Sequence, residues 1–250
     1  LCADLGDEGI IRVVGVLRAG DRRERERPLT ATRHVKNLLH KLGGPHGVIR
    51  QCEFFLYTEK DKEAVRLCRE RGYAFPEVTG WIRAVAKDFQ LVKEMGLKET
   101  GILTSASDYH IFLKLHLTRE QALEKYLALV KTALEAGITP RCHLEDITRA
   151  DIYGFIVPFA QALMSLSREA KARIKIRLCD TMGYGIPWAE AALPRSVPKL
   201  VRALTKEAGV PKDCLEWHGH NDFHLVTANG IAAWLYGCAA LNATVLGFGE

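Results

Sequence analysis

From about residue 48 onward, the chain alternates short β-rich runs with longer segments of helical periodicity. This alternation is typical of βαβ units, which build a parallel sheet. The expected strands are Val48–Phe55, Glu77–Ile82, Glu99–Thr104, Thr139–Leu144, Ile174–Cys179, Cys214–Gly219 and Leu241–Gly247. In a chain of 250 residues, this many strands favour closure into a (β/α)8, or TIM, barrel. No G-x-G-x-x-G turn follows a strand, which argues against an open dinucleotide-binding sheet.

Helix start and stop signals lie between the expected strands. Thr58 can cap a helix that ends near Gly72, and Thr118 with Gln121 forms a capping-box pattern before a long amphipathic segment. Gly137 stands where a helix-terminating glycine is expected. The sequence therefore predicts one α/β barrel domain over residues 35–250.

Residues 1–34 form an atypical N-terminal segment. Gly9–Leu17 has the composition of a strand, but the mixed-charge run 21–27 that follows has no apolar face. A helix is expected from about Ala31 to Leu42, ending at Gly43-Gly44-Pro45. The count is therefore seven clear strands and one atypical first strand.

Composition and charge argue against several classes of partner. No run of eighteen or more apolar residues occurs, so we expect no membrane-spanning helix. The net charge is only +5 and its clusters mix both signs, so we expect no nucleic-acid partner. The seven cysteines include no C-x-x-C pair, which favours reduced thiols and a cytoplasmic protein.

Two histidines at the end of the seventh expected strand suggest a metal site. His218 and His220 are separated by one glycine and followed by Asn221 and Asp222. Because residues i and i+2 of a strand point to the same face, both imidazoles can bind one ion. The alternative is that they are ordinary polar loop residues. We favour a divalent metal ion, because strand ends form the active site of an α/β barrel.

A second polar group is expected at the end of the fifth strand. Arg141, His143 and Glu145 alternate with apolar residues and so share the inner face of the barrel. Burying these groups is costly unless they pair or bind a ligand. Two interpretations stay open: a substrate site, or a structural ion-pair ladder.

Other strand ends add candidate residues. Thr181 follows the sixth strand, His110 follows the fourth and Arg83 follows the third. Each is weak evidence alone, since loops are polar anyway. Their recurrence after successive strands supports a site at the mouth of the barrel.

The motifs at these positions resemble the superfamily of 2-isopropylmalate synthase, homocitrate synthase and 3-hydroxy-3-methylglutaryl-CoA lyase, the DRE-type TIM-barrel metallolyases. The resemblance runs from about residue 35 to residue 250. It is carried by RQCEFFLY, SASDYH, HLEDITRAD, CDTMGYGIP, HGHNDFHLVTANGIAAWLYG and GFGE.

The resemblance implies roles for individual residues. His218 and His220 would be ligands of a divalent metal ion, Mg2+, Mn2+ or Zn2+. Glu145 and His110 would be catalytic. The implied substrate-binding residues are Arg141, His143, Thr181, Arg83 and Asn221, although relatives often carry serine at the position of His143.

Asn221-Asp222 after the second histidine looks like the condensing branch, since the lyase pattern has Asp-Thr there. Condensing enzymes of this family join acetyl-CoA to an α-keto acid in carboxylic acid metabolism and amino-acid biosynthesis. A guanidinium at Arg141 suits a second substrate carboxylate. We therefore favour 2-oxoglutarate or oxaloacetate, giving homocitrate or citrate, over formation of 2-isopropylmalate. For the full-length protein we expect a homodimer.

The sequence departs from the family pattern at both ends. The family's R-D-G-x-Q strand, which supplies an aspartate ligand, has no counterpart among Asp4, Asp7 and Asp21, and R-x-G-N does not follow the closing GFGE. We therefore expect an incomplete barrel that lacks the last helix, with weak activity from this chain alone. Two alternatives remain: a metal-dependent lyase or aldolase of the same superfamily, and a non-catalytic barrel.

Overall fold

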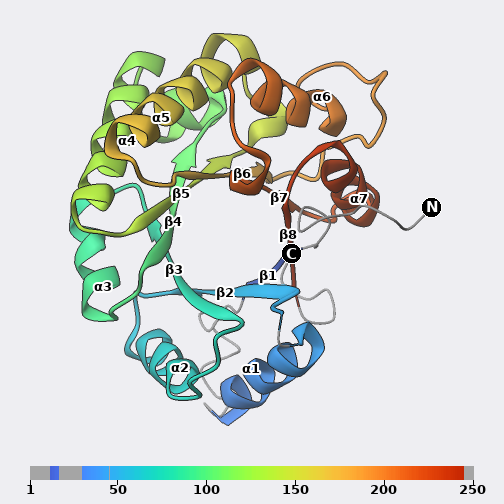
Figure 1. Ribbon diagram of the computed structural model, residues 1–250. Coiled ribbons are helices and arrows are strands. Elements are labelled where there is room, and N and C mark those ends of the chain that lie inside the picture. The colour runs from blue at the N-terminus through green and yellow to red at the C-terminus, as the bar shows by residue number, and fades with distance from the viewer. Residues whose placement is uncertain (1–11, 17–29, 45, 245–250) are drawn as a thin grey trace.

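Eight parallel strands close into a barrel in the order of the chain, and the last pairs with the first (Figure 1). The computed structural model describes residues 12–16, 30–44 and 46–244. The strands are β1 Arg12–Val16, β2 Ile49–Phe55, β3 Glu77–Arg83, β4 Glu99–Ser105, β5 Thr139–Glu145, β6 Lys175–Asp180, β7 Leu215–Gly219 and β8 Ala240–Ala243. The predicted α/β barrel is confirmed, and each of the seven clearly expected strands is present.

The segment with the composition of a strand near the N-terminus is also a strand. β1 pairs with β2 on one side and with β8 on the other, so it completes the ring of strands. The rest of the atypical segment up to residue 29 lies outside the described residues, as do Asp4, Asp7, Asp21 and the closing GFGE. β8 is the last element that the structure describes.

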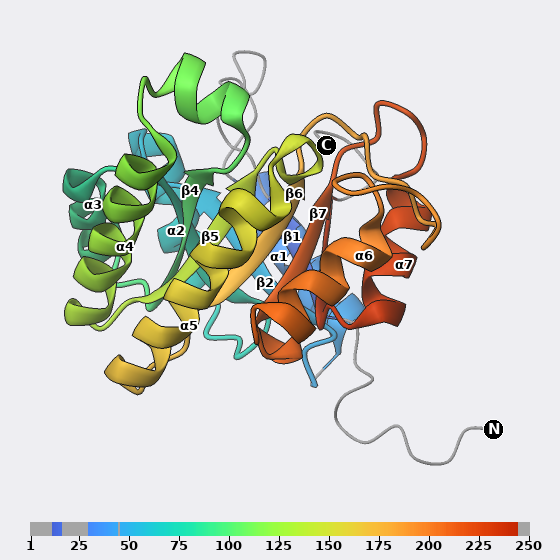
Figure 2. The same ribbon diagram turned by 90° about the horizontal axis from the view of Figure 1, so that it is seen from above.

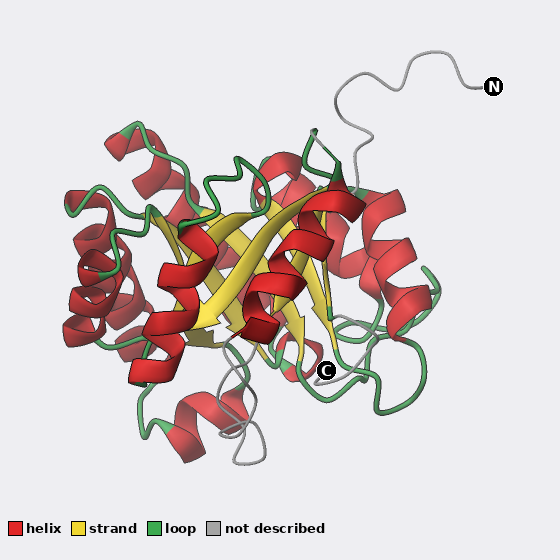
Figure 3. Cartoon of the chain, turned by 90° about the horizontal axis from the view of Figure 1, so that it is seen from below, coloured by secondary structure: helices red, strands yellow, loops and turns green. Residues whose placement is uncertain are grey.

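Helices surround the barrel on its outer side (Figures 2 and 3). The α-helices are α1 Thr30–Gly43, α2 Glu59–Arg69, α3 Phe89–Glu94, α4 Arg119–Glu135, α5 Val157–Ala170, α6 Val197–Arg202 and α7 Val226–Tyr236. Short 3-10 or π turns are η3 Ala86–Asp88, η4 Tyr109–Lys114, η5 Ile147–Arg149, η6 Ile152–Ile156, η7 Ala203–Glu207 and η8 Lys212–Cys214. In the part of the chain described, no helix is long and apolar enough to cross a membrane.

The predicted helix caps form as expected. Thr58 and Thr118 each make a capping box with the residue three positions later, which satisfies backbone N–H groups at the starts of α2 and α4. Gly137 follows α4 with a φ of 69°, a left-handed conformation that glycine adopts without strain.

The alternation of side chains along each strand separates two environments. On β5, Cys142 and Leu144 are buried in the hydrophobic layer between barrel and helices. Arg141, on the opposite face, contacts side chains of β2, β4 and β7, which only the barrel interior brings together. The interior is therefore unusually polar, and it opens at the carboxyl ends of the strands.

Candidate active site at the mouth of the barrel

A cavity of about 330 Å³ lies inside the barrel at the carboxyl ends of the strands. Its walls come from six of the eight strands and from the residues that directly follow them, Thr181 and His220. The lining residues are Glu53, Phe54, Phe55, Trp81, Leu103, His143, Glu145, Arg177, Cys179, Thr181, His218 and His220. The cavity therefore lies where barrel enzymes place their active sites.

The two histidines of the H-x-H segment converge in this cavity. The Nε2 atoms of His218 and His220 are 3.2 Å apart, and the rings meet at 67°. Nδ1 of His218 is 3.0 Å from Oδ1 of Asn242 on β8. Because a carbonyl oxygen can only accept, Nδ1 carries the proton, and the lone pair of that ring lies on Nε2.

This spacing fits two ligands of a single metal ion. Two nitrogens that each bind one ion at about 2.1 Å lie roughly 3.0–3.4 Å apart in octahedral or tetrahedral geometry, and the observed separation is 3.2 Å. The described residues contain no group of three or more His, Cys, Asp or Glu side chains that could hold a metal ion. The donor set that the structure describes is therefore one pair of imidazoles.

Glu145 lines the cavity from the end of β5, two strands along the barrel from β7, and is held by three neighbours. Its Oε2 accepts a hydrogen bond from the Ser105 hydroxyl, and Nζ of Lys114 lies 2.9 Å from Oε2 and 3.1 Å from Oε1. Nδ1 of His110, on the π-helical turn η4, is 3.4 Å from Oε2. A carboxylate and an imidazole in contact are a common arrangement for proton transfer, and the structure brings the two predicted catalytic residues together.

Thr181 lines the same cavity directly after β6. Its hydroxyl accepts a hydrogen bond of 2.8 Å from the backbone N–H of Asp146, which connects the ends of β5 and β6. The preceding Asp180 is fully buried and accepts hydrogen bonds from Thr148, Tyr184 and Gly185. Burial raises the pKa of Asp180 above its usual value. Asp180 therefore orders the loop that presents Thr181.

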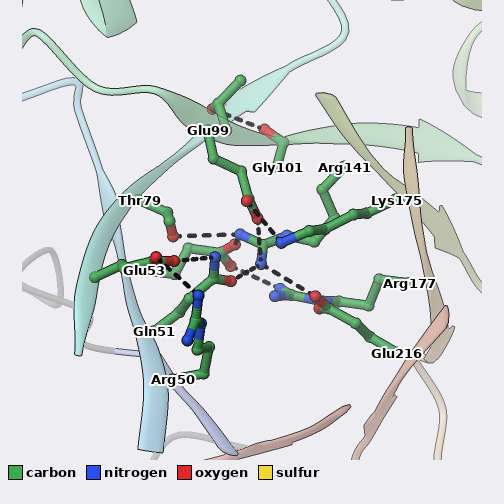
Figure 4. Close-up of polar contacts among 12 residues, drawn as sticks. Arg50, Gln51, Glu53, Thr79, Glu99, Gly101, Arg141, Lys175, Arg177 and Glu216 are labelled. Carbon is green, nitrogen blue, oxygen red and sulfur yellow. Dashed lines mark hydrogen bonds and ion pairs between the residues drawn. The ribbon is translucent and has the colours of Figure 1, made fainter. Parts of the chain in front are cut away.

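Arg141 is buried in an ion-pair cluster beneath the cavity (Figure 4). Its guanidinium lies 2.7 Å from Glu53, 3.1 Å from Glu99 and 3.4 Å from Glu216. We expected the Arg141 guanidinium to suit a second substrate carboxylate, but glutamates of three other strands already pair with it. Arg141 does not line the cavity, and its contacts are those of the structural ion-pair interpretation.

The cluster sets the charges of its members. Burial alone would raise the pKa of Glu216, but the guanidiniums of Arg141 and Arg177 lower it to about 2. His143 lies 3.6 Å from Glu53 at the top of the cluster. Burial, together with the positive charges of Arg177 and Arg141, lowers the pKa of His143 well below its usual value. His143 is therefore neutral and faces the cavity as a polar group.

Besides Arg141, two further predicted substrate-binding residues do not line the cavity. Arg83, at the end of β3, binds Asp88 through Nε at 2.9 Å and Nη2 at 3.2 Å, and its guanidinium stacks on the ring of Tyr57. Asn221 is exposed, and its Oδ1 accepts a hydrogen bond of 3.4 Å from the N–H of Val226 at the start of α7. Both residues support loops around the mouth.

The sequence interpretation missed Arg177, Glu53 and Asn242. Arg177 and Glu53 face the cavity from β6 and β2, and Asn242 orients His218 from β8. The alternation that singled out Arg141 also places Arg177 on the inner face, two residues before Cys179. That signal was present in the sequence, whereas the contact between Asn242 and His218 depends on the register of the neighbouring strands β7 and β8, which the sequence does not give.

Comparison with known proteins gives consistent matches. Residues 52–250 match the family described as HMGL-like. The chain is 61% identical over 230 residues to a citrate (Re)-synthase of Syntrophus aciditrophicus, covering 91% of this chain and 37% of that protein. It is 54% identical to a citrate (Re)-synthase of Clostridium kluyveri, covering 89% of this chain and 50% of that protein. The chain thus spans half or less of the length of these curated relatives.

Among solved structures, the hydroxymethylglutaryl-CoA lyase of Pseudomonas aeruginosa superposes with a TM-score of 0.71. The match covers 95% of this chain and 77% of that chain at 19% sequence identity. At this identity the likeness concerns the fold, and it agrees with the barrel described above.

Proposed function

Because this chain belongs to the HMGL-like family, the DRE-TIM metallolyases, we propose that it works as an acyltransferase that condenses acetyl-CoA with an α-keto acid. The proposal rests on one observation above all: His218 and His220 converge in the same cavity as Glu145. Relatives named citrate (Re)-synthase support oxaloacetate as the keto acid, because its condensation with an acetyl group gives citrate. Homocitrate and 2-isopropylmalate synthesis receive less support.

In this proposal, His218 and His220 hold a divalent cation, which, when bound, supplies Lewis-acid polarisation of the keto carbonyl. Asn242 keeps the lone pair of His218 on Nε2, the nitrogen that faces His220. Thr181 presents its hydroxyl to the keto acid from the end of β6.

Proton transfer is assigned to His110 and Glu145. Condensation requires removal of a proton from the methyl group of the acetyl thioester, and an imidazole held against a carboxylate can take it. Ser105 and Lys114 keep the Glu145 carboxylate in one position. The apolar walls formed by Phe55, Trp81 and Leu103 limit water at the reacting carbons.

The homodimer and the cytoplasmic location expected from the sequence belong to the same proposal. The six cysteines that the structure describes are free thiols, which is the state that a reducing compartment favours.

The test is a thiol-release assay with acetyl-CoA, Mn2+ and one of three keto acids: oxaloacetate, 2-oxoglutarate or 2-oxoisovalerate. We expect release of CoA to be fastest with oxaloacetate, with citrate as the product, and to be lost in His218→Ala. Absence of thiol release with all three keto acids, or equal rates in wild type and His218→Ala, would contradict the proposal.

A further inference from the structure

Arg177 reaches the mouth cavity from β6, yet its side chain is only 1% exposed. Nη1 lies 2.7 Å from Oε1 of Glu53, and Nε lies 3.0 Å from Oε2 of Glu216. Glu216 lies on the neighbouring strand β7 and Glu53 on β2, which is not a neighbour of β6, and the two carboxylates together fix the plane of the guanidinium. The remaining nitrogen, Nη2, is buried and has no hydrogen-bond partner among the described residues.

A buried guanidinium N–H without a partner is costly. Proteins satisfy nearly all buried polar groups, and a missing bond to a charged group costs more than one to a neutral group. Nε of Arg141 also has no hydrogen-bond partner in the described part of the chain, but Arg141 does not line the cavity. Arg177 is therefore the guanidinium whose open donor is within reach of a ligand.

The surroundings of Arg177 suit an anion. The two oxygens of Glu53 are each occupied by a guanidinium, Oε1 by Arg177 and Oε2 by Arg141, so this carboxylate does not repel a second one strongly. His143 stands on the same wall, and its Nε2 is likewise buried without a hydrogen-bond partner among the described residues. A neutral imidazole beside an open guanidinium donor offers two polar contacts and no negative charge.

We propose that Arg177 binds the second carboxylate of the keto acid through Nη2 and thereby restricts the site to dicarboxylic substrates. This inference rests on the proposed function, because it assumes that a keto acid occupies the cavity with its other carboxylate at His218 and His220. Glu53 and Glu216 are positioning residues for Arg177. The site selects dicarboxylic acids because Nη2 of Arg177 stays without a hydrogen-bond acceptor when a monocarboxylic acid binds.

The test measures binding without acetyl-CoA, using L-malate as the dicarboxylic probe and L-lactate as its monocarboxylic counterpart. Calorimetric titrations in the presence of Mn2+ compare the wild type with Arg177→Gln and Arg177→Lys. The lysine variant keeps a cation for Glu53 or Glu216 but lacks the fork that reaches the cavity. The matched control is Lys175→Met, which removes a cation on the same face of β6. Nζ of Lys175 lies 2.7 Å from Glu99, and Lys175 does not line the cavity.

We expect the wild type to bind malate more tightly than lactate. Both Arg177 variants should weaken malate binding about tenfold or more and leave lactate binding unchanged, whereas Lys175→Met should retain the preference for malate. Equal affinity of the wild type for malate and lactate would overturn the inference, even if the variants failed to fold. Unchanged malate binding in a folded Arg177 variant would overturn it as well.

Failure of the proposed function has a different signature. If malate binding depends on Arg177 but no keto acid releases CoA, the condensation proposal fails and the assignment of Arg177 as a carboxylate-binding residue stands.

Discussion

The Nε2 atoms of His218 and His220 lie 3.2 Å apart inside the mouth of the barrel. This short distance follows from local geometry. His218 is the last but one residue of β7 and His220 directly follows the strand, so the two side chains lie two positions apart on one face. Asn242 adds the constraint that fixes which nitrogen of His218 carries the proton. The barrel thus presents two imidazole nitrogens at the spacing that one metal ion requires.

The orientation of His218 should depend on Asn242. Asn242→Ala removes the acceptor 3.0 Å from Nδ1, so the ring loses its preferred tautomer, and we expect Mn2+ or Zn2+ affinity to fall roughly 10- to 100-fold. Asn37→Ala removes an amide that bonds Tyr73 near the surface and serves as the control. Equal metal affinity in both variants would show that Asn242 does not position the ligand.

Glu145 should affect the chemical step more than substrate binding. Glu145→Gln keeps the shape of the side chain but removes its charge next to His110, so kcat for thiol release should fall about 10²- to 10⁴-fold with KM for oxaloacetate little changed. Glu135→Gln, at the exposed end of α4, should leave kcat unaltered. A loss confined to KM in Glu145→Gln would argue for substrate binding and against proton transfer.

The ion-pair cluster should make stability dependent on pH. The pKa of Glu216 falls from 4.5 in the unfolded chain to about 2 in the fold. This shift corresponds to a contribution of about 3 kcal/mol to the free energy of unfolding. A lowered carboxyl pKa stabilises the protein fully above the unfolded value of 4.5 and loses that effect as the pH falls towards 2. Glu216→Gln should therefore be less stable than wild type in urea unfolding at neutral pH.

The difference between wild type and Glu216→Gln should shrink across that acidic window. A difference in unfolding free energy that stays constant down to the lowest pH at which both proteins fold would show that the pKa of Glu216 is not lowered.

Gly101 should be needed for the position of His143. A Cβ at residue 101 would lie 2.5 Å from Nε2 of His143 and 3.1 Å from Oε2 of Glu53, so Gly101→Ala should destabilise the fold by about 1–3 kcal/mol. Gly230→Ala is the matched control, because its Cβ would meet only Leu241 at 3.6 Å. In a helix this change should be neutral or stabilising. Similar melting temperatures for the two variants would mean that His143 moves aside without cost.

The sequence was sufficient to predict the barrel and much of its mouth. Alternating strands and helices predicted β2 to β8, and the H-x-H spacing predicted that His218 and His220 converge. Local patterns could not reveal the partners of Arg141. Glu99 lies on the neighbouring strand β4, but Glu53 and Glu216 lie on β2 and β7 and meet Arg141 only across the interior of the barrel. The balance of charges inside a barrel depends on such long-range contacts. Arg83 stays outside the lining for a local reason, because Asp88, five residues later, binds its guanidinium.

Titration of the chain with Mn2+ or Zn2+, followed by calorimetry, tests most directly whether His218 and His220 form a metal site. We expect one ion per chain with modest affinity, because the described residues offer two imidazoles and leave the other coordination positions to water or substrate. His218→Ala and His220→Ala should each abolish this binding, while His46→Ala, in an exposed turn, should not change it. Binding of equal strength in the wild type and in His218→Ala would contradict the account.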